Sequence, residues 1–294
     1  MLEGLAKLYK ELHNEKRFTK IKEQCKLIED SLGQIDYYDF LQTAFAENKQ
    51  IPPYARQYVK QQFLNKIAQL NEILIDKDWI KKDNKRVKKI AQKISEADWM
   101  KPQQEVESIQ QFYGEAIYAI IEFLDETSFH FDNVEEDVHE LRRKLRWLSI
   151  YPHALQGCIQ LTKEKKMLPH LKKYLTKAIT TSPFNSFPAA ADNTSFLLLN
   201  KNYFLALSWL IAELGNLKDE GLIIAGLKEA IQQATSVNDA DAYKKTYILL
   251  GKKQRKMESI LNDAEKITKT FVTENNLEHL VFSTATIAEK NRGK

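Results

Sequence analysis

The sequence predicts an all-α protein made of two packed helical bundles, and three observations support that fold class. Apolar residues recur at three- and four-residue steps along most of the 294-residue chain, while stretches typical of β-strands are scarce. Glycine and proline are few, with 9 and 7 copies, as expected where helices dominate. The chain is also long enough to bury two separate cores.

The first half reads as a series of helices. Residues 2–30 form one or two amphipathic stretches, and Ile51-Pro52-Pro53 is a break that opens the next helix at Tyr54. A lysine-rich segment from Lys81 to Lys93 follows, and residues 103–130 are strongly helical. We therefore expect an N-terminal bundle over residues 1–130.

The second half begins with a helix over residues 133–150. Asn133 is the predicted N-cap, with Glu136 three residues later as in a capping box. Residues 180–194 are the longest predicted loop, where a lid or an insertion is expected. These elements predict a C-terminal bundle over residues 131–294.

One long helix is predicted near residues 240–272. Its apolar seam follows alternating three- and four-residue steps, as in core packing, through Tyr243, Tyr247, Leu250, Met257, Leu261 and Ala264. Lysines fall on the opposite side, forming a second basic stripe of Lys245, Lys252 and Lys256.

A short sequence recurs in the two halves. Leu32-Gly33-Gln34-Ile35 matches Leu214-Gly215-Asn216-Leu217, and each is followed by acids and a leucine. A helix–Gly–helix unit near the start of each half is consistent with a diverged duplication of one bundle.

The expected compartment is the cytoplasm. Cys25 and Cys158 lie far apart and form no metal-type pair, which fits a reducing environment. The N-terminus lacks a signal-peptide core, and the oily stretch 196–214 is too polar to span a bilayer. We expect no membrane partner.

The net charge of +4 conceals a strong asymmetry. Residues 102–141 hold eleven acids and no lysine or arginine, whereas residues 142–177 hold ten lysines or arginines and one acid. The two blocks can pair with each other across a folded surface. Alternatively, the basic block lines an anion site.

Four basic side chains share one face of the helix at 133–150. At about 100° per residue, the spacing i, i+3, i+4, i+7 brings them together. They are His139, Arg142, Arg143 and Arg146. The opposite face carries Val138, Leu141, Leu145 and Leu148. Such a helix can bury one side and present positive charge to an anion, unless His139 bonds Glu135 or Glu136 and the arginines pair with the acidic block.

These residues resemble a known family. His139-x-Leu141-Arg142-x-x-x-Arg146 is similar to the His-x-x-Arg-x-x-x-Lys/Arg element of CHAD domains, and residues 214–219 resemble the family's second element, a Leu-Gly turn. The resemblance implies an all-helical fold of two related bundles that binds inorganic polyphosphate through a basic surface. No His-x-x-Arg element precedes Leu32, so the resemblance covers residues 133–230.

The candidate ligand-binding set follows from phosphate chemistry. Guanidinium forks and ammonium groups hold phosphate oxygens, and a polyanion gains further by releasing counterions. The set comprises His139, Arg142, Arg143, Arg146, Lys218, Lys252 and Lys256. Further point charges are available from Lys163, Lys165, Lys166, Lys172 and Lys173.

Other function classes lack their motifs. The chain has no Walker loop, dinucleotide glycine pattern or Gly-x-Ser-x-Gly elbow, and Glu136-x-x-His139 occurs once where a di-iron bundle needs two copies. With 44 basic against 40 acidic residues, nucleic acid is an unlikely partner. The predicted function is non-enzymatic binding of polyphosphate or a similar phosphate-rich anion, without cofactor or metal. The alternative is a helical scaffold that recognises another protein.

Overall fold

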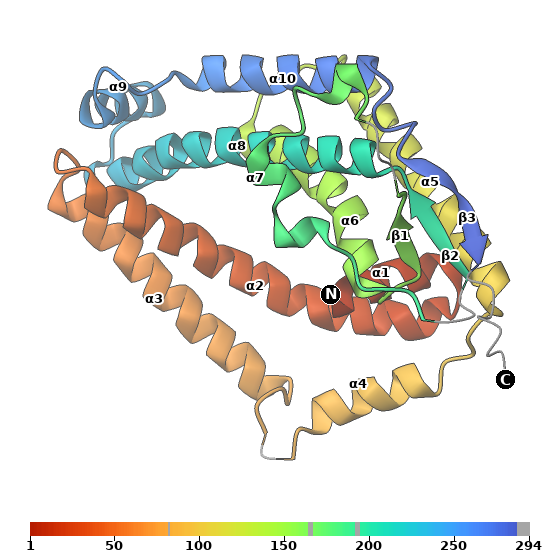
Figure 1. Cartoon of the computed structure of the whole chain (residues 1–294). Coiled ribbons are helices and arrows are strands. Elements are labelled where there is room, and N and C mark those ends of the chain that lie inside the picture. The colour runs from red at the N-terminus through yellow and green to blue at the C-terminus, as the bar shows by residue number, and fades with distance from the viewer. Residues whose placement is uncertain (82, 164–166, 192–194, 287–294) are drawn as a thin grey trace, which may run out of the picture. The chain divides into compact units, whose positions relative to one another are not determined.

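The computed structural model describes residues 1–81, 83–163, 167–191 and 195–286 (Figure 1). The structure is 72% helical and its one sheet has three short strands, which confirms the predicted all-α class of packed helices. No helix among these residues is both long and apolar enough to cross a membrane.

Ten α-helices and three strands form the framework of the described residues. In chain order they are α1 (Leu2–Leu12), α2 (Glu15–Glu47), α3 (Pro53–Asp76), α4 (Lys85–Ser95), α5 (Pro102–Glu126), α6 (Glu140–Ala154), β1 (Ile159–Leu161), α7 (Lys177–Thr180), β2 (Ser195–Leu199), α8 (Lys201–Thr235), α9 (Asp239–Leu250), α10 (Met257–Thr273) and β3 (Val281–Thr286). A π-helical turn, Val134–His139, leads directly into α6.

The chain divides into two compact units that interleave along the sequence. Unit 1 contains residues 1–19, 98–217 and 261–294, and unit 2 contains residues 20–97 and 218–260. The expected boundary between the two bundles, after residue 130, is not a boundary of either unit, since residues 98–217 all belong to unit 1. The division falls inside α2, α8 and α10, because each of these helices contributes residues to both units.

Unit 1 is built around α5, which packs against α1, α6 and the sheet (Figure 1). Strand β2 lies between the other two, parallel to β1 with Ile159 opposite Leu197, and antiparallel to β3. The alternate residues Ser195, Leu197 and Leu199 are buried, as expected for a strand with one covered face. The predicted oily stretch 196–214 is therefore shared between a strand and a helix.

Unit 2 is a helical cluster in which α2 and α3 form a hairpin (Figure 1). Its core joins these helices to the second half of α8 and to α9. The buried members are Leu41, Phe45, Ile51, Ala55, Val59, Leu227, Ala230, Ile231 and Ala242. Pro53 occupies the first turn of α3, so the predicted opening of a helix after the Pro-Pro pair is confirmed.

A tyrosine–carboxylate cluster links the same helices. The Glu229 carboxylate accepts hydrogen bonds from the hydroxyls of Tyr58 (2.6 Å) and Tyr38 (3.2 Å). Burial and the neighbouring carboxylate raise the pKa of Tyr38 to about 12, so the hydroxyl remains a donor at neutral pH. Glu229 thereby ties α8 to both arms of the α2–α3 hairpin.

The predicted single helix at 240–272 is wrong, because the chain breaks between α9 and α10. Gly251 ends α9 with φ of 84°, a conformation that glycine adopts without steric cost. Met257 then starts α10, and its backbone N–H donates to the Tyr247 hydroxyl (2.9 Å). Lys252 and Lys256 consequently lie in the connecting turn, and the predicted stripe of lysines along one helix face does not form.

Neither Leu-Gly sequence forms a turn. Residues 32–35 lie within α2 and residues 214–217 lie within α8, both in continuous helix. A glycine inside a helix costs about 1 kcal/mol relative to alanine, which long flanking segments can absorb. The duplication of a bundle stays a prediction.

The segment 180–194 contains local structure and tertiary anchors. A 3₁₀ turn spans Pro183–Asn185, and the Asn185 amide donates to the Ile179 carbonyl (2.9 Å) and accepts from the Ser208 hydroxyl (2.8 Å). The Gln160 amide donates to the Pro188 carbonyl (2.7 Å). These bonds tie residues 183–188 to β1 and α8, whereas residues 192–194 of the predicted lid lie outside the described residues.

Candidate anion-binding site

The start of the π-helical turn that leads into α6 is set by its capping residues. The Asn133 side chain accepts hydrogen bonds from the backbone N–H groups of Glu135 (2.8 Å) and Glu136 (3.3 Å), which confirms the predicted N-cap. The reciprocal bond comes from Asp137, whose carboxylate accepts from the N–H groups of Asp132 and Asn133 (both 2.8 Å). Asp137 takes the capping role predicted for Glu136, one residue later, because the first turn is π-helical.

The apolar face of the helix is buried as predicted. Leu141, Leu145 and Leu148 are fully inaccessible to solvent, as is Val138 in the preceding turn. The Tyr113 hydroxyl donates to the Leu148 carbonyl (2.8 Å), so α5 is bonded to α6 inside this core. The orientation of the basic face follows from this packing.

Ion pairs occupy part of the basic face. His139 Nδ1 lies 2.8 Å from Glu135 Oε1, and Arg143 Nη2 lies 2.6 Å from Glu140 Oε2. Lys144 also contacts Glu140, at 3.7 Å. The exposed Arg146 makes no ion pair with the residues that the structure describes. Glu140 thus neutralises Arg143, and Glu135 holds the His139 ring in a hydrogen bond.

Arg142 lies at the edge of the buried face and packs onto α8. Its Nε donates to the Ile211 carbonyl (3.2 Å), and a Cβ atom built on Gly215 would lie 3.0 Å from that nitrogen. Gly215 therefore provides the space that the guanidinium occupies. On the helical wheel Arg142 lies about 60° from Leu145 and about 40° from Arg146, between the buried and the basic face, and its hydrogen bond to Ile211 directs the guanidinium toward α8.

The three predicted lysines lie in unit 2. Lys218 is largely buried, with 17% of its side chain exposed, and its Nζ pairs with Asp219 Oδ1 at 2.9 Å. Lys252 and Lys256 are exposed in the turn between α9 and α10. Of the three, Lys252 lines a depression in the surface of the unit.

This depression, which we call the lysine depression, lies where two turns of unit 2 meet. Its volume is about 440 Å³ and its lining is Glu47, Asn48, Lys49, Gln50, Leu250, Gly251, Lys252 and Lys253. The Asn48 amide donates to the Leu249 carbonyl (3.3 Å), which holds the end of α2 against the end of α9. The turn after α2, near residue 50, is thereby joined to the turn after α9, about 200 residues later in the chain.

The charge in the lysine depression is positive. Lys49, Lys252 and Lys253 are exposed and make no ion pair with the residues that the structure describes, while Glu47 supplies one carboxylate. Helix C-termini carry partial negative charge, which lysines nearby offset. Here Arg56 Nη2 already donates to the backbone carbonyl of Asn48 (2.9 Å), just after the end of α2. The ammonium groups of the three lysines are therefore available to an outside anion.

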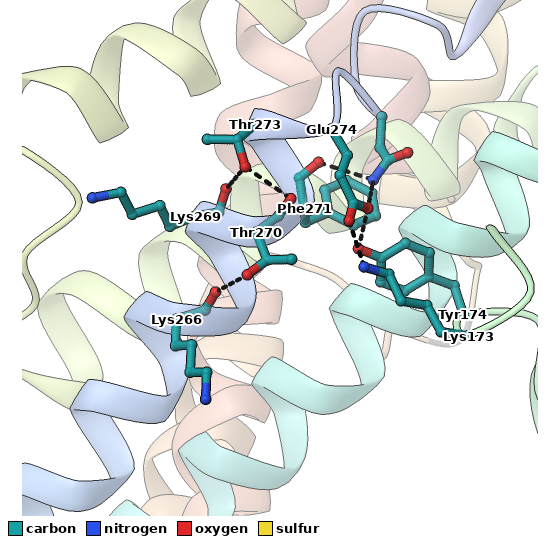
Figure 2. A network of polar contacts seen from close by, with 9 residues as sticks. Lys173, Tyr174, Lys266, Lys269, Thr270, Phe271, Thr273 and Glu274 are labelled. Carbon is teal, nitrogen blue, oxygen red and sulfur yellow. Dashed lines mark hydrogen bonds and ion pairs between the residues drawn. The ribbon is translucent and has the colours of Figure 1, made fainter. Parts of the chain in front are cut away.

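A second predicted group of lysines is partly neutralised. Lys165 and Lys166 lie outside the described residues, and Lys173 pairs with Glu274 (Figure 2). Burial tends to raise the pKa of Glu274, but hydrogen bonds from Lys173, Tyr174 and Asn276 together lower it. The Glu274 cluster thus uses Lys173 to join the segment before α7 to the end of α10.

The exposed lysines Lys266 and Lys269 of α10 do not line the lysine depression. The hydroxyls of Thr270 and Thr273 donate to the carbonyls of Lys266 and Lys269 at 2.8 Å each, bonds internal to the helix (Figure 2). Among the described residues, no group of three His, Cys, Asp or Glu side chains could hold a metal ion.

Sequence reasoning identified one member of the lysine depression, Lys252, and missed Lys49 and Lys253. The Pro52-Pro53 break indicated the first of the two turns, and Gly251 followed by two lysines is the signal that could have indicated the second. Neither indicates that the turns meet. No family model, curated protein or solved structure matches this chain, and the CHAD resemblance stays a prediction.

Proposed function

We propose that this protein is a non-enzymatic binder of inorganic polyphosphate or a similar phosphate-rich anion, and that the lysine depression is its principal site. The observation that carries the proposal is the meeting of Lys49, Lys252 and Lys253 around a depression of about 440 Å³, without ion pairs to described residues. Cys25 and Cys158 form no disulfide in the described part of the chain, which fits a cytoplasmic setting.

The chemistry of the lining favours a polyanion over a small organic ligand. Ammonium groups are strongly hydrated point charges that bind phosphate without a fixed geometry. Organic ligands are usually held in enclosed, mainly apolar pockets, whereas only Leu250 and Gly251 are non-polar among the lining residues. A chain of phosphates could contact several lysines at once and lie across an open surface.

The basic face of α6 has a secondary role in this proposal. His139 and Arg143 already hold acids, and Arg142 lies against α8. An anion there must compete with carboxylates, which lowers the net gain. Arg146 is the one member of this face that can bind without breaking an ion pair to a described residue.

A scaffold function is the second candidate. The pairing of His139 with Glu135 and of Arg143 with Glu140 favours it, because these ion pairs remove charge from the surface that first suggested an anion. In that case the two units serve to present helical surfaces to another protein.

Titration with polyphosphate at two salt concentrations tests the proposal. The variant Lys252→Glu/Lys253→Glu is compared with the matched control Lys244→Glu/Lys245→Glu, which reverses two exposed lysines on α9 outside the depression. Each surface charge contributes about 1 kcal/mol at contact, so the first variant should bind at least about 30-fold more weakly. Its salt slope should fall by roughly 1.5 units, since each phosphate contact contributes just under one.

The control separates local binding from net charge, because both variants change the charge of the protein equally. Equal loss of affinity in both variants would attribute binding to net charge alone and reject the depression as the site. Absence of binding at low salt in the parent protein would leave the scaffold function. Loss of affinity only in Arg146→Glu would move the site to α6.

A further inference from the structure

The turn between α3 and α4 exposes large aliphatic side chains. Ile75 near the end of α3 is 56% exposed, Ile80 is 58% exposed and Val87 on α4 is 52% exposed. On α4 the apolar side is only partly covered, since Ile90 is buried whereas Val87, three residues earlier, is not. The apolar side of α4 thus has an edge without a partner in unit 2.

Hydrogen bonds make this turn compact. Arg86 Nε on α4 donates to the Lys77 carbonyl just beyond α3 (2.8 Å), and the Asn84 N–H donates to the Lys81 carbonyl (3.0 Å). Asn84 adopts φ of 51°, which turns the chain into α4. These contacts hold the first turn of α4 against the end of α3, and Ile80 and Val87 are the exposed aliphatic residues on either side of the bonded segment.

Cations outnumber acids in the segment that carries the exposed aliphatic side chains, and on α4 Lys85 and Lys89 lie on the side opposite Val87. Between residues 77 and 89 the described residues include six lysines or arginines and two acids. Asp78 is already paired with Lys81. By contrast, Lys85, Lys88 and Lys89 are exposed and make no ion pair with any residue that the structure describes.

We propose that this surface, the α3–α4 tip (Ile75, Lys77, Ile80, Lys85, Val87, Lys88 and Lys89), docks peripherally on an anionic lipid bilayer. Lysines can contact the lipid phosphates while Ile80 and Val87 enter the apolar boundary below them. Polyphosphate or nucleic acid offers charge but no apolar phase for these side chains. The bilayer interface offers both.

This inference is independent of the lysine depression, which shares no residue with the α3–α4 tip. The expectation of no membrane partner came from the lack of a spanning segment, and peripheral docking requires none. Lys82 lies outside the described residues and is not part of the tip.

Sedimentation of the full chain with lipid vesicles tests the inference. The vesicles are phosphatidylcholine alone or an equimolar mixture with phosphatidylserine, and we expect binding only to the mixture. One lysine near an anionic surface contributes about fivefold to partitioning, so Lys88→Glu/Lys89→Glu should lower it at least about 25-fold. Ile80→Ser/Val87→Ser should lower it at least about tenfold, since both side chains lose their apolar contact.

Matched controls lie on α9 in the same unit. Lys244→Glu/Lys245→Glu reverses two exposed lysines, and Ile248→Ser removes an aliphatic side chain that is 66% exposed. Both controls should bind as the parent does, and circular dichroism should show parental helicity in all variants. No sedimentation of the parent with the mixture overturns the inference. Loss with the lysine variant but not with Ile80→Ser/Val87→Ser also overturns it, because the binding is then electrostatic adsorption without entry of the apolar side chains.

Discussion

The contact between Gly226 and Leu41 makes a sharp prediction about unit 2. A Cβ atom built on Gly226 of α8 would lie 2.8 Å from Leu41 Cδ2 and 3.2 Å from its Cγ, whereas carbon atoms pack at about 3.5–4.0 Å. Leu41 is fully buried on α2, so it has little room to move. Gly226→Ala should therefore strain the packing of α8 against α2.

The expected magnitude is the difference between two effects. Overpacking a core costs about 1–3 kcal/mol, and replacing glycine by alanine in a helix returns about 0.5–1 kcal/mol. Gly226→Ala should thus lower the free energy of unfolding by roughly 0–2.5 kcal/mol, and should not raise it. Urea unfolding measures this change, provided that the slope with urea is unchanged.

Two control substitutions isolate the steric effect. Gly33 on α2 and Gly114 on α5 have open space where a Cβ would lie, so alanine at either position should stabilise the protein by about 0.5–1 kcal/mol. Leu41→Ala alone should cost about 2–5 kcal/mol. Combined with Gly226→Ala it should cost less than the sum, because the added methyl group occupies part of the cavity. If Gly226→Ala stabilises as much as Gly33→Ala, the packing argument is refuted.

Two further predictions concern unit 1. His130 Nδ1 lies 2.8 Å from Glu265 and Nε2 lies 3.3 Å from Asp132, and the hydrogen bond to Glu265 contributes most to the raised pKa of His130. The cluster therefore stabilises the folded state fully below the ordinary histidine pKa of about 6.5. That stabilisation is lost as pH rises through the raised pKa. His130→Ala should therefore melt below the parent in mild acid and close to it in alkali, and a difference independent of pH contradicts the assignment. Asn133→Ala removes the cap of the turn before α6 and should cost about 0.5–2 kcal/mol, while Asn133→Asp should retain the parental melting temperature.

Much of the local structure could be predicted because its causes are local. The apolar periodicity of Leu141, Leu145 and Leu148 predicted the buried face of α6, and Asn133 predicted its start. The break at Gly251 was missed because the apolar seam continues across it from Tyr247 to Met257. A seam with helical spacing does not reveal a change of chain direction between its members.

The candidate site could be predicted only in part. The cations of α6 were recognised, and the stated alternative, that His139 bonds Glu135 and that an arginine pairs with the acidic block, is what the structure shows for His139 and Arg143. The choice between the alternatives depends on rotamers that sequence does not specify. The three-stranded sheet was missed because its strands are short and come from distant parts of the chain.

By itself, the sequence determined the all-α class, the helix that begins at the Pro52-Pro53 break, the helix over most of residues 103–130 and the buried face of α6, since these follow from the periodicity and capping of neighbouring residues. Tertiary structure alone decided that Arg142 lies against Gly215 and that Lys49 lies beside Lys252 and Lys253. Both results join residues that are far apart in the chain. Such contacts depend on how whole helices pack, and no local pattern of residues specifies that.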